Sequence, residues 1–291
     1  MIAETSVKAP LNIRQAGAFG ADMLAASGSP SPWLDCQLLL AKSMGATRER
    51  LMAHPFDNIT ESQWLYFQSC LTRREQGEPI AYILGEREFY GLSFRVDSRV
   101  LVPRPETETL VDRALELAGQ EAAVLEIGTG SGCVAVAMAI ARPGWEITAT
   151  DISEHALEVA RENAKIHGVD DRISFLHADM YPEGKGRFDL LVSNPPYVSG
   201  VETVEASVHK YEPHMALYSE DNGLAITAKI ISLAPSRLTD GGAMALETGL
   251  GMSARVAAAC QETGFFMSTI ATKDIYGVDR VVSALGPEWT K

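Results

Sequence analysis

Residues 124–132 read Val-Leu-Glu-Ile-Gly-Thr-Gly-Ser-Gly, an apolar strand that runs into a glycine-rich turn. An apolar segment without proline or glycine follows at 133–141, and we predict a helix there. A strand, a turn and a helix in this order begin a βαβ unit. Glycines let the backbone approach a ligand closely, and a helix N-terminus supplies free N–H groups. The stretch therefore predicts a ligand site at the end of its strand.

The rest of the C-terminal part repeats this alternation. We predict strands at 123–127, 146–150, 172–177, 188–193, 243–247, 265–270 and 280–285, and helices at 133–141, 153–166, 223–238 and 252–262. Residues 198–221 are predicted as a long loop. Strands that alternate with helices favour an α/β fold with a doubly wound, mostly parallel sheet, which binds ligands at the carboxyl ends of its strands.

The N-terminal part has a different pattern. Apolar residues at helical spacing, together with N-cap residues, predict helices at 12–27, 33–44, 47–53 and 60–77. Residues 80–102 alternate and favour a β-hairpin, and 105–118 reads as a helix with Pro105 in its first turn. We therefore expect a helical bundle over 1–77, a hairpin linker over 78–103 and an α/β domain over 104–291.

Composition limits the possible functions. The chain has 291 residues, 46% hydrophobic and 22% charged, with a net charge of −13, which argues against tight nucleic-acid binding. Its four cysteines are scattered without a Cys-x-x-Cys pair, which favours a reducing compartment and no structural metal. Residues 1–14 lack the apolar region of a targeting segment, and no apolar run reaches membrane-spanning length. We expect a cytoplasmic protein.

The residues around the glycine turn favour one class of ligand. Cys133 stands where a dinucleotide fingerprint has its third glycine, and Glu126 would repel a pyrophosphate but attract an ammonium group. Asp151 ends the next strand, 19 residues after Gly132, where a carboxylate can accept hydrogen bonds from two ribose hydroxyls. It can alternatively be an acidic residue at a helix N-terminus.

Asp179 and Met180 follow the third strand, where they can contact an adenine amino group and its ring. An ammonium, a ribose and an adenine without phosphate describe S-adenosylmethionine. The candidate cofactor-binding residues are Glu126, Gly128, Thr129, Gly130, Ser131, Gly132, Asp151, Asp179, Met180 and Asn194.

A second candidate site follows the strand at 188–193, where the chain reads Asn194-Pro195-Pro196-Tyr197. Two prolines end the strand stiffly, because neither has an N–H group for a ladder. The Asn194 side-chain oxygen and the Pro195 carbonyl can then both face a cleft as acceptors for a planar –NH2 group. We expect Tyr197 to pack on the flat face of the substrate. Alternatively, Asn194 only caps a turn.

The glycine turn with Glu126 and Asp151 resembles the class I methyltransferase fold, and Asn-Pro-Pro-Tyr resembles the motif of amide and exocyclic-amine N-methyltransferases. Further segments are similar to the release factor glutamine methyltransferases, the HemK/PrmC family. They are Gly77-Glu-Pro-Ile-Ala-Tyr-Ile-Leu-Gly85, Phe89-Tyr-Gly91, Val102-Pro-Arg-Pro-Glu-Thr-Glu108 and Tyr211-Glu-Pro213. Two positions depart from that pattern: Thr248 stands in place of a histidine and Asn222 in place of an aspartate.

The resemblance implies N5-methylation of the glutamine in the Gly-Gly-Gln motif of class 1 peptide chain release factors, with S-adenosylmethionine as donor. It also implies catalytic roles for Asn194, Pro195, Pro196 and Tyr197, and we assign docking of the protein substrate to the N-terminal bundle. Three alternatives stay open: an adenine-N6 methyltransferase on DNA or RNA, a ribosomal-protein glutamine methyltransferase, and a cofactor-binding module without catalysis.

Overall fold

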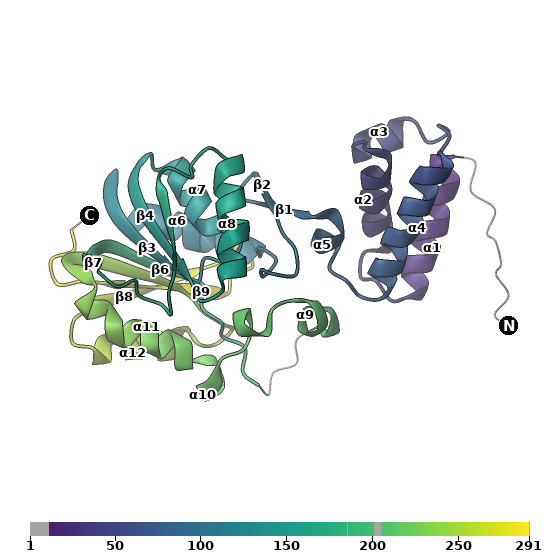
Figure 1. Ribbon diagram of the computed structural model, residues 1–291. Coiled ribbons are helices and arrows are strands. Elements are labelled where there is room, and N and C mark those ends of the chain that lie inside the picture. Colours follow the sequence, from purple (N-terminus) through teal and green to yellow (C-terminus); the bar gives the residue numbers. More distant parts are fainter. Residues whose placement is uncertain (1–11, 185, 201–204, 291) are drawn as a thin grey trace. The chain divides into compact units, whose positions relative to one another are not determined.

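The computed structural model describes residues 12–184, 186–200 and 205–290 (Figure 1). They form two compact units, one made of 12–85 with 206–211 and the other of 86–205 with 212 onward. Most of the segment expected to lack a targeting signal, residues 1–14, lies outside the described residues. No helix within the described ranges is long and apolar enough to cross a membrane.

The first unit is helical. Its helices are α1 (Ile13–Ala26), α2 (Pro32–Met44), α3 (Arg48–Ala53), α4 (Glu61–Glu75), α5 (Ile80–Leu84) and α9 (Ala206–Tyr211). The predicted capping box forms at Thr60, whose side chain accepts from the N–H of Gln63. A Cβ atom on Gly20 would lie only 2.8 Å from Phe67, so this glycine lets α1 and α4 pack closely. The unit extends past the expected limit at residue 77 to residue 85.

The β-pattern predicted over 80–102 is only partly correct. Residues 80–84 form the short helix α5, which ends at Gly85 in the left-handed conformation. The hairpin itself is confirmed as β1 (Glu86–Phe89) and β2 (Leu92–Arg95). Tyr90 and Gly91 connect the strands, both with positive φ, as a type I′ two-residue hairpin turn requires.

The second unit contains a seven-stranded sheet in the order β5-β4-β3-β6-β7-β9-β8. The strands are β3 (Glu121–Ile127), β4 (Gly144–Asp151), β5 (Ile173–His177), β6 (Phe188–Ser193), β7 (Leu238–Glu247), β8 (Ser268–Lys273) and β9 (Asp279–Leu285). Strands β3 to β7 pair in parallel, and β9 is antiparallel to both β7 and β8. The predicted doubly wound, mostly parallel sheet is therefore confirmed.

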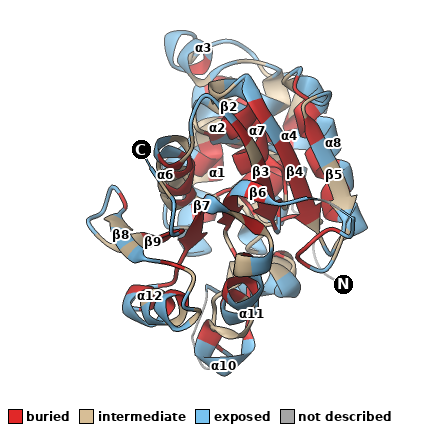
Figure 2. Cartoon of the chain, turned by 90° about the vertical axis from the view of Figure 1, so that its left-hand side faces the viewer, coloured by how far each residue is buried: buried red, intermediate tan, exposed pale blue. Residues whose placement is uncertain are grey.

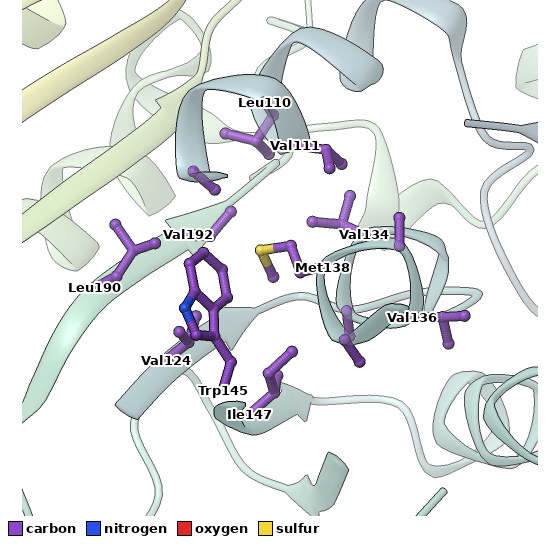
Figure 3. Close-up of a cluster of buried hydrophobic side chains, with 14 of the residues drawn as sticks. Leu110, Val111, Val124, Val134, Val136, Met138, Trp145, Ile147, Leu190 and Val192 are labelled. Atoms are coloured by element: carbon purple, nitrogen blue, oxygen red, sulfur yellow. The ribbon is translucent and has the colours of Figure 1, made fainter. Parts of the chain in front are cut away.

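Helices cover both faces of this sheet (Figure 1). One face carries α6 (Glu108–Leu117), α7 (Cys133–Ala141) and α8 (Glu154–Ile166), and the other carries α11 (Ala225–Leu233) and α12 (Ser253–Glu262). Successive strand residues alternate between the two cores, so that Leu190 and Val192 join one and Leu191 the other. Figure 3 shows the first core, where the side chains of Met138 from α7 and Trp145 from β4 fill the space between helix and sheet. The central strands are buried along most of their length (Figure 2).

Three predictions about the C-terminal part are wrong. The helix predicted at 223–238 is too long, because α11 ends at Leu233 and β7 begins at Leu238. The described part of 198–221 is not a continuous loop, because it contains α9, a 3-10 turn at His214–Ala216 and the start of α10 (Glu220–Gly223). Strand β8 begins at Ser268 rather than at 265. Phe265 and Phe266 instead pack edge to face before the strand, with ring centroids 5.1 Å apart. Aromatic residues predict a strand as well as they predict a core contact, so the sequence pattern did not separate the two.

Candidate active site

A cavity of about 390 Å³ opens at the carboxyl ends of β3, β4 and β6. The register aligns these ends, since Ile127 on β3 pairs with Thr150 on β4 and with Ser193 on β6. The predicted site residues that line the cavity are Glu126, Gly128, Thr129, Gly130, Ser131, Asp151, Asp179, Met180, Asn194, Pro195 and Pro196. Two predicted residues, Gly132 and Tyr197, are not part of the lining. The volume falls within the ~300–1,000 Å³ usual for small-molecule sites.

The glycine turn has the conformation that its sequence predicts. Gly128, Gly130 and Gly132 all have positive φ, which other residues rarely adopt. Gly128 and Gly130 have open space where a side chain would lie, as a closely approaching ligand needs. Gly132 serves a different purpose, because a Cβ atom there would lie 3.0 Å from the Cβ of Ala160 on α8. It allows the start of α7 to pack on α8.

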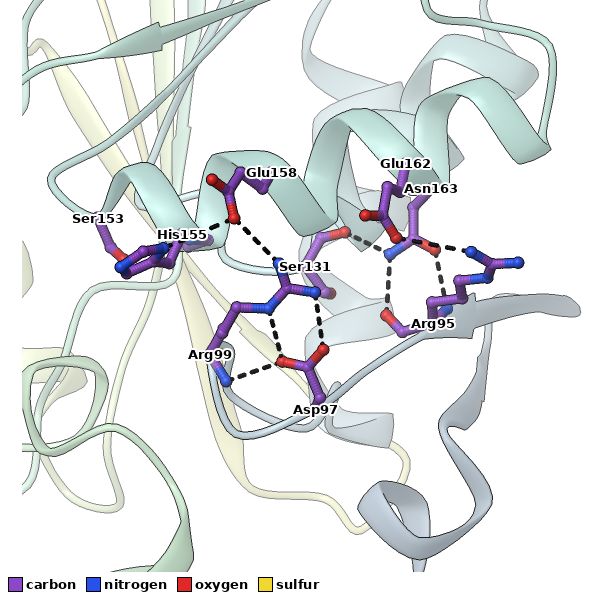
Figure 4. Close-up of polar contacts among 10 residues, drawn as sticks. Arg95, Asp97, Arg99, Ser131, Ser153, His155, Glu158, Glu162 and Asn163 are labelled. Carbon is purple, nitrogen blue, oxygen red and sulfur yellow. Dashed lines mark hydrogen bonds and ion pairs between the residues drawn. The ribbon is translucent and has the colours of Figure 1, made fainter.

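A buried asparagine supports this turn from behind. Asn163 on α8 donates from Nδ2 to the carbonyl of Ser131 over 2.8 Å and to the carbonyl of Arg95 over 3.0 Å (Figure 4). Its Oδ1 accepts from the Arg95 N–H over 2.8 Å. The single amide therefore ties the glycine turn to β2. Sequence reasoning missed Asn163, because an asparagine inside a helix carries no signal of a distant partner.

Glu126 is fully buried and faces the cavity. Its Oε2 accepts from the hydroxyl of Thr129 over 2.6 Å. Burial raises the pKa of Glu126 to about 7, the Thr129 hydrogen bond opposes that rise, and the nearby charge of Asp151 adds to it. A cationic group in the cavity would lower this pKa again, because it favours the ionised carboxylate.

Asp151 organises two backbone segments at once. Its Oδ2 accepts from the N–H of Gly130 and its Oδ1 from the N–H of Ser153, both over 2.9 Å. Burial raises the pKa of Asp151 above its ordinary value, while these N–H groups oppose the rise. Each carboxylate oxygen has a second lone pair, so both can still accept a hydrogen bond from a ligand. Asp151 therefore holds the start of the following helix and can also bind a ligand.

Asp179 and Met180 follow strand β5. Asp179 forms an ion pair with Lys229 on α11, with Oδ2 and Nζ 2.9 Å apart. Met180 is buried with a φ of 74°, which is uncommon for this residue. Its carbonyl accepts from the hydroxyl of Thr150 over 2.7 Å, and this bond holds the unusual backbone in place. Both side chains border the same cavity as Asp151.

The Asn-Pro-Pro-Tyr segment follows β6, which pairs with β3 on the side away from β4 and Asp151. Asn194 Nδ2 donates to the hydroxyl of Thr107 over 3.2 Å. Tyr197 is not among the lining residues, and its hydroxyl donates to Oε1 of the buried Glu247 over 3.4 Å. Burial raises the pKa of Tyr197, and the charge of Glu247 adds to the rise.

The segment at 102–108 also borders the cavity. Arg104 and Thr107 belong to the lining, whereas Glu108 accepts from the N–H of Tyr90 over 2.8 Å. Glu212 fixes the segment, because its carboxylate accepts from the N–H of Val102 over 3.0 Å and pairs with Arg104 over 2.7 Å. The Tyr-Glu-Pro motif at 211–213 is therefore joined to the segment at 102–108 in space.

The two departures from the family pattern lie close to the Asn-Pro-Pro-Tyr segment. Asn222 has a φ of 51°, which an asparagine tolerates as well as an aspartate. The next residue, Gly223, has no room for a side chain, because a Cβ atom would lie 2.0 Å from the carbonyl oxygen of Tyr197. Thr248 is buried, and its hydroxyl lies 3.1 Å from that of Ser253. Neither residue lines the cavity.

Comparisons with known proteins identify both parts of the chain. The PrmC N-terminal domain matches residues 15–85, and the methyltransferase small domain matches residues 106–212. Among solved structures, that of the hMettl16 catalytic domain in complex with MAT2A 3'UTR hairpin 6 aligns with a TM-score of 0.55 at 17% identity, covering 80% of this chain and 84% of that one. This likeness confirms the class I methyltransferase fold.

Two relatives match most of the chain, and one of them matches nearly all of it. The release factor glutamine methyltransferase of Lactococcus lactis subsp. lactis is 42% identical over 230 residues, which cover 78% of this chain and 84% of that protein. The one from Rhodopirellula baltica is 37% identical over 293 residues, which cover 97% of this chain and 99% of that protein. The chain therefore belongs to the release factor glutamine methyltransferase family.

Proposed function

We propose that this protein transfers a methyl group from S-adenosylmethionine to the side-chain nitrogen of the glutamine in the Gly-Gly-Gln motif of class 1 release factors. Its family supports the reaction and the substrate. The observation that carries the proposal is that one cavity brings together the Glu126 and Asp151 carboxylates and the Asn194 amide. The first two suit a cationic nucleoside, and the third suits a substrate that carries an –NH2 group.

The cavity has the groups that S-adenosylmethionine needs. Glu126 would hold the α-ammonium group, and Asp151 would accept hydrogen bonds from the ribose hydroxyls, each worth about 1.5–3 kcal/mol. Asp179 would accept from the adenine amino group, with Met180 against the ring. The left-handed Gly128 and Gly130 leave room for a ligand to approach the turn. No cluster of metal-ligating side chains occurs in the described part of the chain.

The reaction needs a nitrogen with an available lone pair. An amide nitrogen is a poor nucleophile, because its lone pair is delocalised into the carbonyl group. Asn194 Oδ1 and the Pro195 carbonyl would accept hydrogen bonds from both of its N–H groups and direct its lone pair at the methyl group. When bound, S-adenosylmethionine supplies an electrophilic methyl group, whose transfer leaves S-adenosylhomocysteine and releases one proton, which we assign to water.

Positioning is the main source of rate in this proposal. Holding two reactants at attack distance contributes on the order of 7–11 kcal/mol. The stiff Pro195-Pro196 backbone suits this task, since prolines restrict the chain. That Tyr197 packs on the flat face of the substrate amide stays a prediction, and so does a cytoplasmic location.

Methyl transfer to three classes of substrate tests the proposal. Labelled S-adenosylmethionine is supplied with a purified release factor, with DNA and RNA, and with ribosomal proteins. We expect label on the release factor alone, and none when alanine replaces the glutamine of its Gly-Gly-Gln motif. Faster transfer to nucleic acid or to a ribosomal protein would refute the substrate, and cofactor binding without transfer to any of them would refute the reaction.

A further inference from the structure

Two side chains next to Asn194 have no role in the reaction described so far. Thr107 belongs to the segment at 102–108, and Glu247 is the last residue of β7. They are 140 residues apart in the sequence, yet both adjoin the Asn194 loop. Their exposed fractions are only 4% and 1%. Buried polar side chains normally have hydrogen-bond partners, so their mutual arrangement carries information.

The contacts form a short chain of polar groups. Asn194 Nδ2 donates to Thr107 Oγ1 over 3.2 Å. The Thr107 hydroxyl also faces the carboxyl of Glu247: burial raises the pKa of this carboxyl, and the Thr107 hydroxyl opposes the rise. One carboxyl oxygen, Oε1, accepts from Tyr197, whereas Oε2 has no hydrogen-bond partner among the described residues. A hydroxyl proton can rotate toward such an acceptor.

The direction of the hydrogen bonds in this series follows from Glu247, its last group. An ionised carboxylate only accepts hydrogen bonds, so the Thr107 hydroxyl, which opposes the rise in the pKa of Glu247, acts toward it as a donor. The oxygen of Thr107 is then left to accept, and the only group of Asn194 that can donate to it is Nδ2. The other end of the amide, Oδ1, must therefore point away from Thr107. A reversed amide would place two acceptors against each other and leave a buried group unpaired.

We propose that Thr107 and Glu247 are positioning residues that fix the side-chain amide of Asn194 in the one orientation that presents Oδ1 to the substrate nitrogen. This inference rests on the proposed function, in which Asn194 accepts a hydrogen bond from the glutamine –NH2 group. A reversed Asn194 would offer a second –NH2 group to the substrate, and two donors cannot bond. The device explains why the segment at 102–108 and the end of β7 meet at this loop.

The arrangement also predicts a dependence on pH. Besides Thr107, the groups that face Glu247 are Tyr197, Arg280 on β9 and Glu106, and its pKa is raised to about 7, mainly by burial. Protonated Glu247 can donate to Thr107, which can then donate to Asn194 Oδ1 and stabilise the reversed amide. Turnover should therefore fall as the pH falls below about 7 at saturating S-adenosylmethionine, whose own binding is measured separately.

The test compares four variants of the full-length protein: Thr107→Val, Thr107→Ser, Glu247→Gln and Asn194→Ala. For each, kcat and KM for the release factor and the Kd for S-adenosylhomocysteine are measured across pH. We expect Thr107→Val to lower kcat on the order of tenfold, because the partly buried Nδ2 of Asn194 loses its acceptor, and to leave Kd unchanged. Thr107→Ser should restore kcat. In Glu247→Gln, kcat should no longer fall at low pH and should equal, at every pH, the value that the wild type reaches at low pH.

The outcomes separate this inference from the function on which it rests. Wild-type kcat in Thr107→Val, with Asn194→Ala inactive, would overturn the positioning role and leave the proposed function standing. Full activity in Asn194→Ala would instead overturn the proposed function. An acidic limb that persists unchanged in Glu247→Gln would remove Glu247 from the device. Loss of S-adenosylhomocysteine binding in both Thr107 variants would show a general structural role and would also overturn the inference.

Discussion

Binding of S-adenosylhomocysteine should depend on pH through Glu126. The carboxyl has a pKa of about 7 in the ligand-free protein, raised chiefly by burial. The α-ammonium group of the ligand pairs only with the ionised carboxylate, so Glu126 must lose its proton before the two groups pair. Affinity should therefore rise with pH and level off above the pKa of the free carboxyl.

The size of the effect follows from the fraction of Glu126 that is ionised. With a pKa of about 7, the apparent affinity for S-adenosylhomocysteine should weaken about 25-fold between about pH 7.5 and about pH 5.5, where one unit of pKa is worth about 1.4 kcal/mol. Calorimetry in buffers of different ionisation enthalpy measures both the affinity and the number of protons released on binding. It should find close to one proton released per ligand at the acidic end and a small fraction at the other.

Two controls isolate the carboxyl. Methylthioadenosine has the adenine and the ribose but no α-ammonium group, so its affinity should vary little over the same range. The variant Glu126→Gln is neutral at every pH and should bind S-adenosylhomocysteine weakly without the pH dependence. An equally steep dependence for methylthioadenosine, or for the variant, would refute the assignment of Glu126 to the ammonium group.

Four further predictions concern stability and binding. Because folding raises the pKa of Glu126, the folded state loses stability as the pH rises from about 4.5 to about 7. The ligand-free variant Glu126→Gln lacks this loss and should be more stable than the wild type at pH ~8 by on the order of 1–3 kcal/mol. Denaturant titration should show that the difference vanishes near pH ~4. Asp151→Asn should weaken S-adenosylhomocysteine and methylthioadenosine alike, by about 1.5–3 kcal/mol in calorimetry. Gly132→Ala should lower the free energy of unfolding by about 1–2 kcal/mol, because its φ of 79° is left-handed and its Cβ atom would press on α8. Phe56 is 68% exposed, so Phe56→Ser should leave stability within about 0.5 kcal/mol but raise KM for a release factor and not for a short Gly-Gly-Gln peptide, if the bundle docks the substrate.

Much of the fold follows from local patterns. Helix 133–141 and strand 188–193 have the predicted bounds, because the helix is an uninterrupted apolar segment after Gly132 and the strand is stopped by Pro195 and Pro196. Helix α5 was missed, since five residues are too few to show a helical period. Helix α9 was missed as well, because it has no buried residue and so lacks an apolar stripe.

The candidate site was predictable where chemistry is local in sequence. Glu126, Asp151 and Asn194 each lie at or next to the carboxyl end of a strand, and parallel strands bring such ends together. The contacts of Asn194 with Thr107, and of Tyr197 with Glu247, join residues that are far apart in the chain. No spacing rule reports such pairs, so only the structure brings them to light.

The most direct test of the central proposal is to locate the methyl group on the product. A release factor is incubated with this protein and S-adenosylmethionine, and the peptide that contains the Gly-Gly-Gln motif is then sequenced by mass spectrometry. We predict a single methyl group on the side-chain nitrogen of that glutamine, and none in a parallel reaction with the Asn194→Ala variant. A methyl group on any other residue, or an equal yield from the variant, would contradict the account.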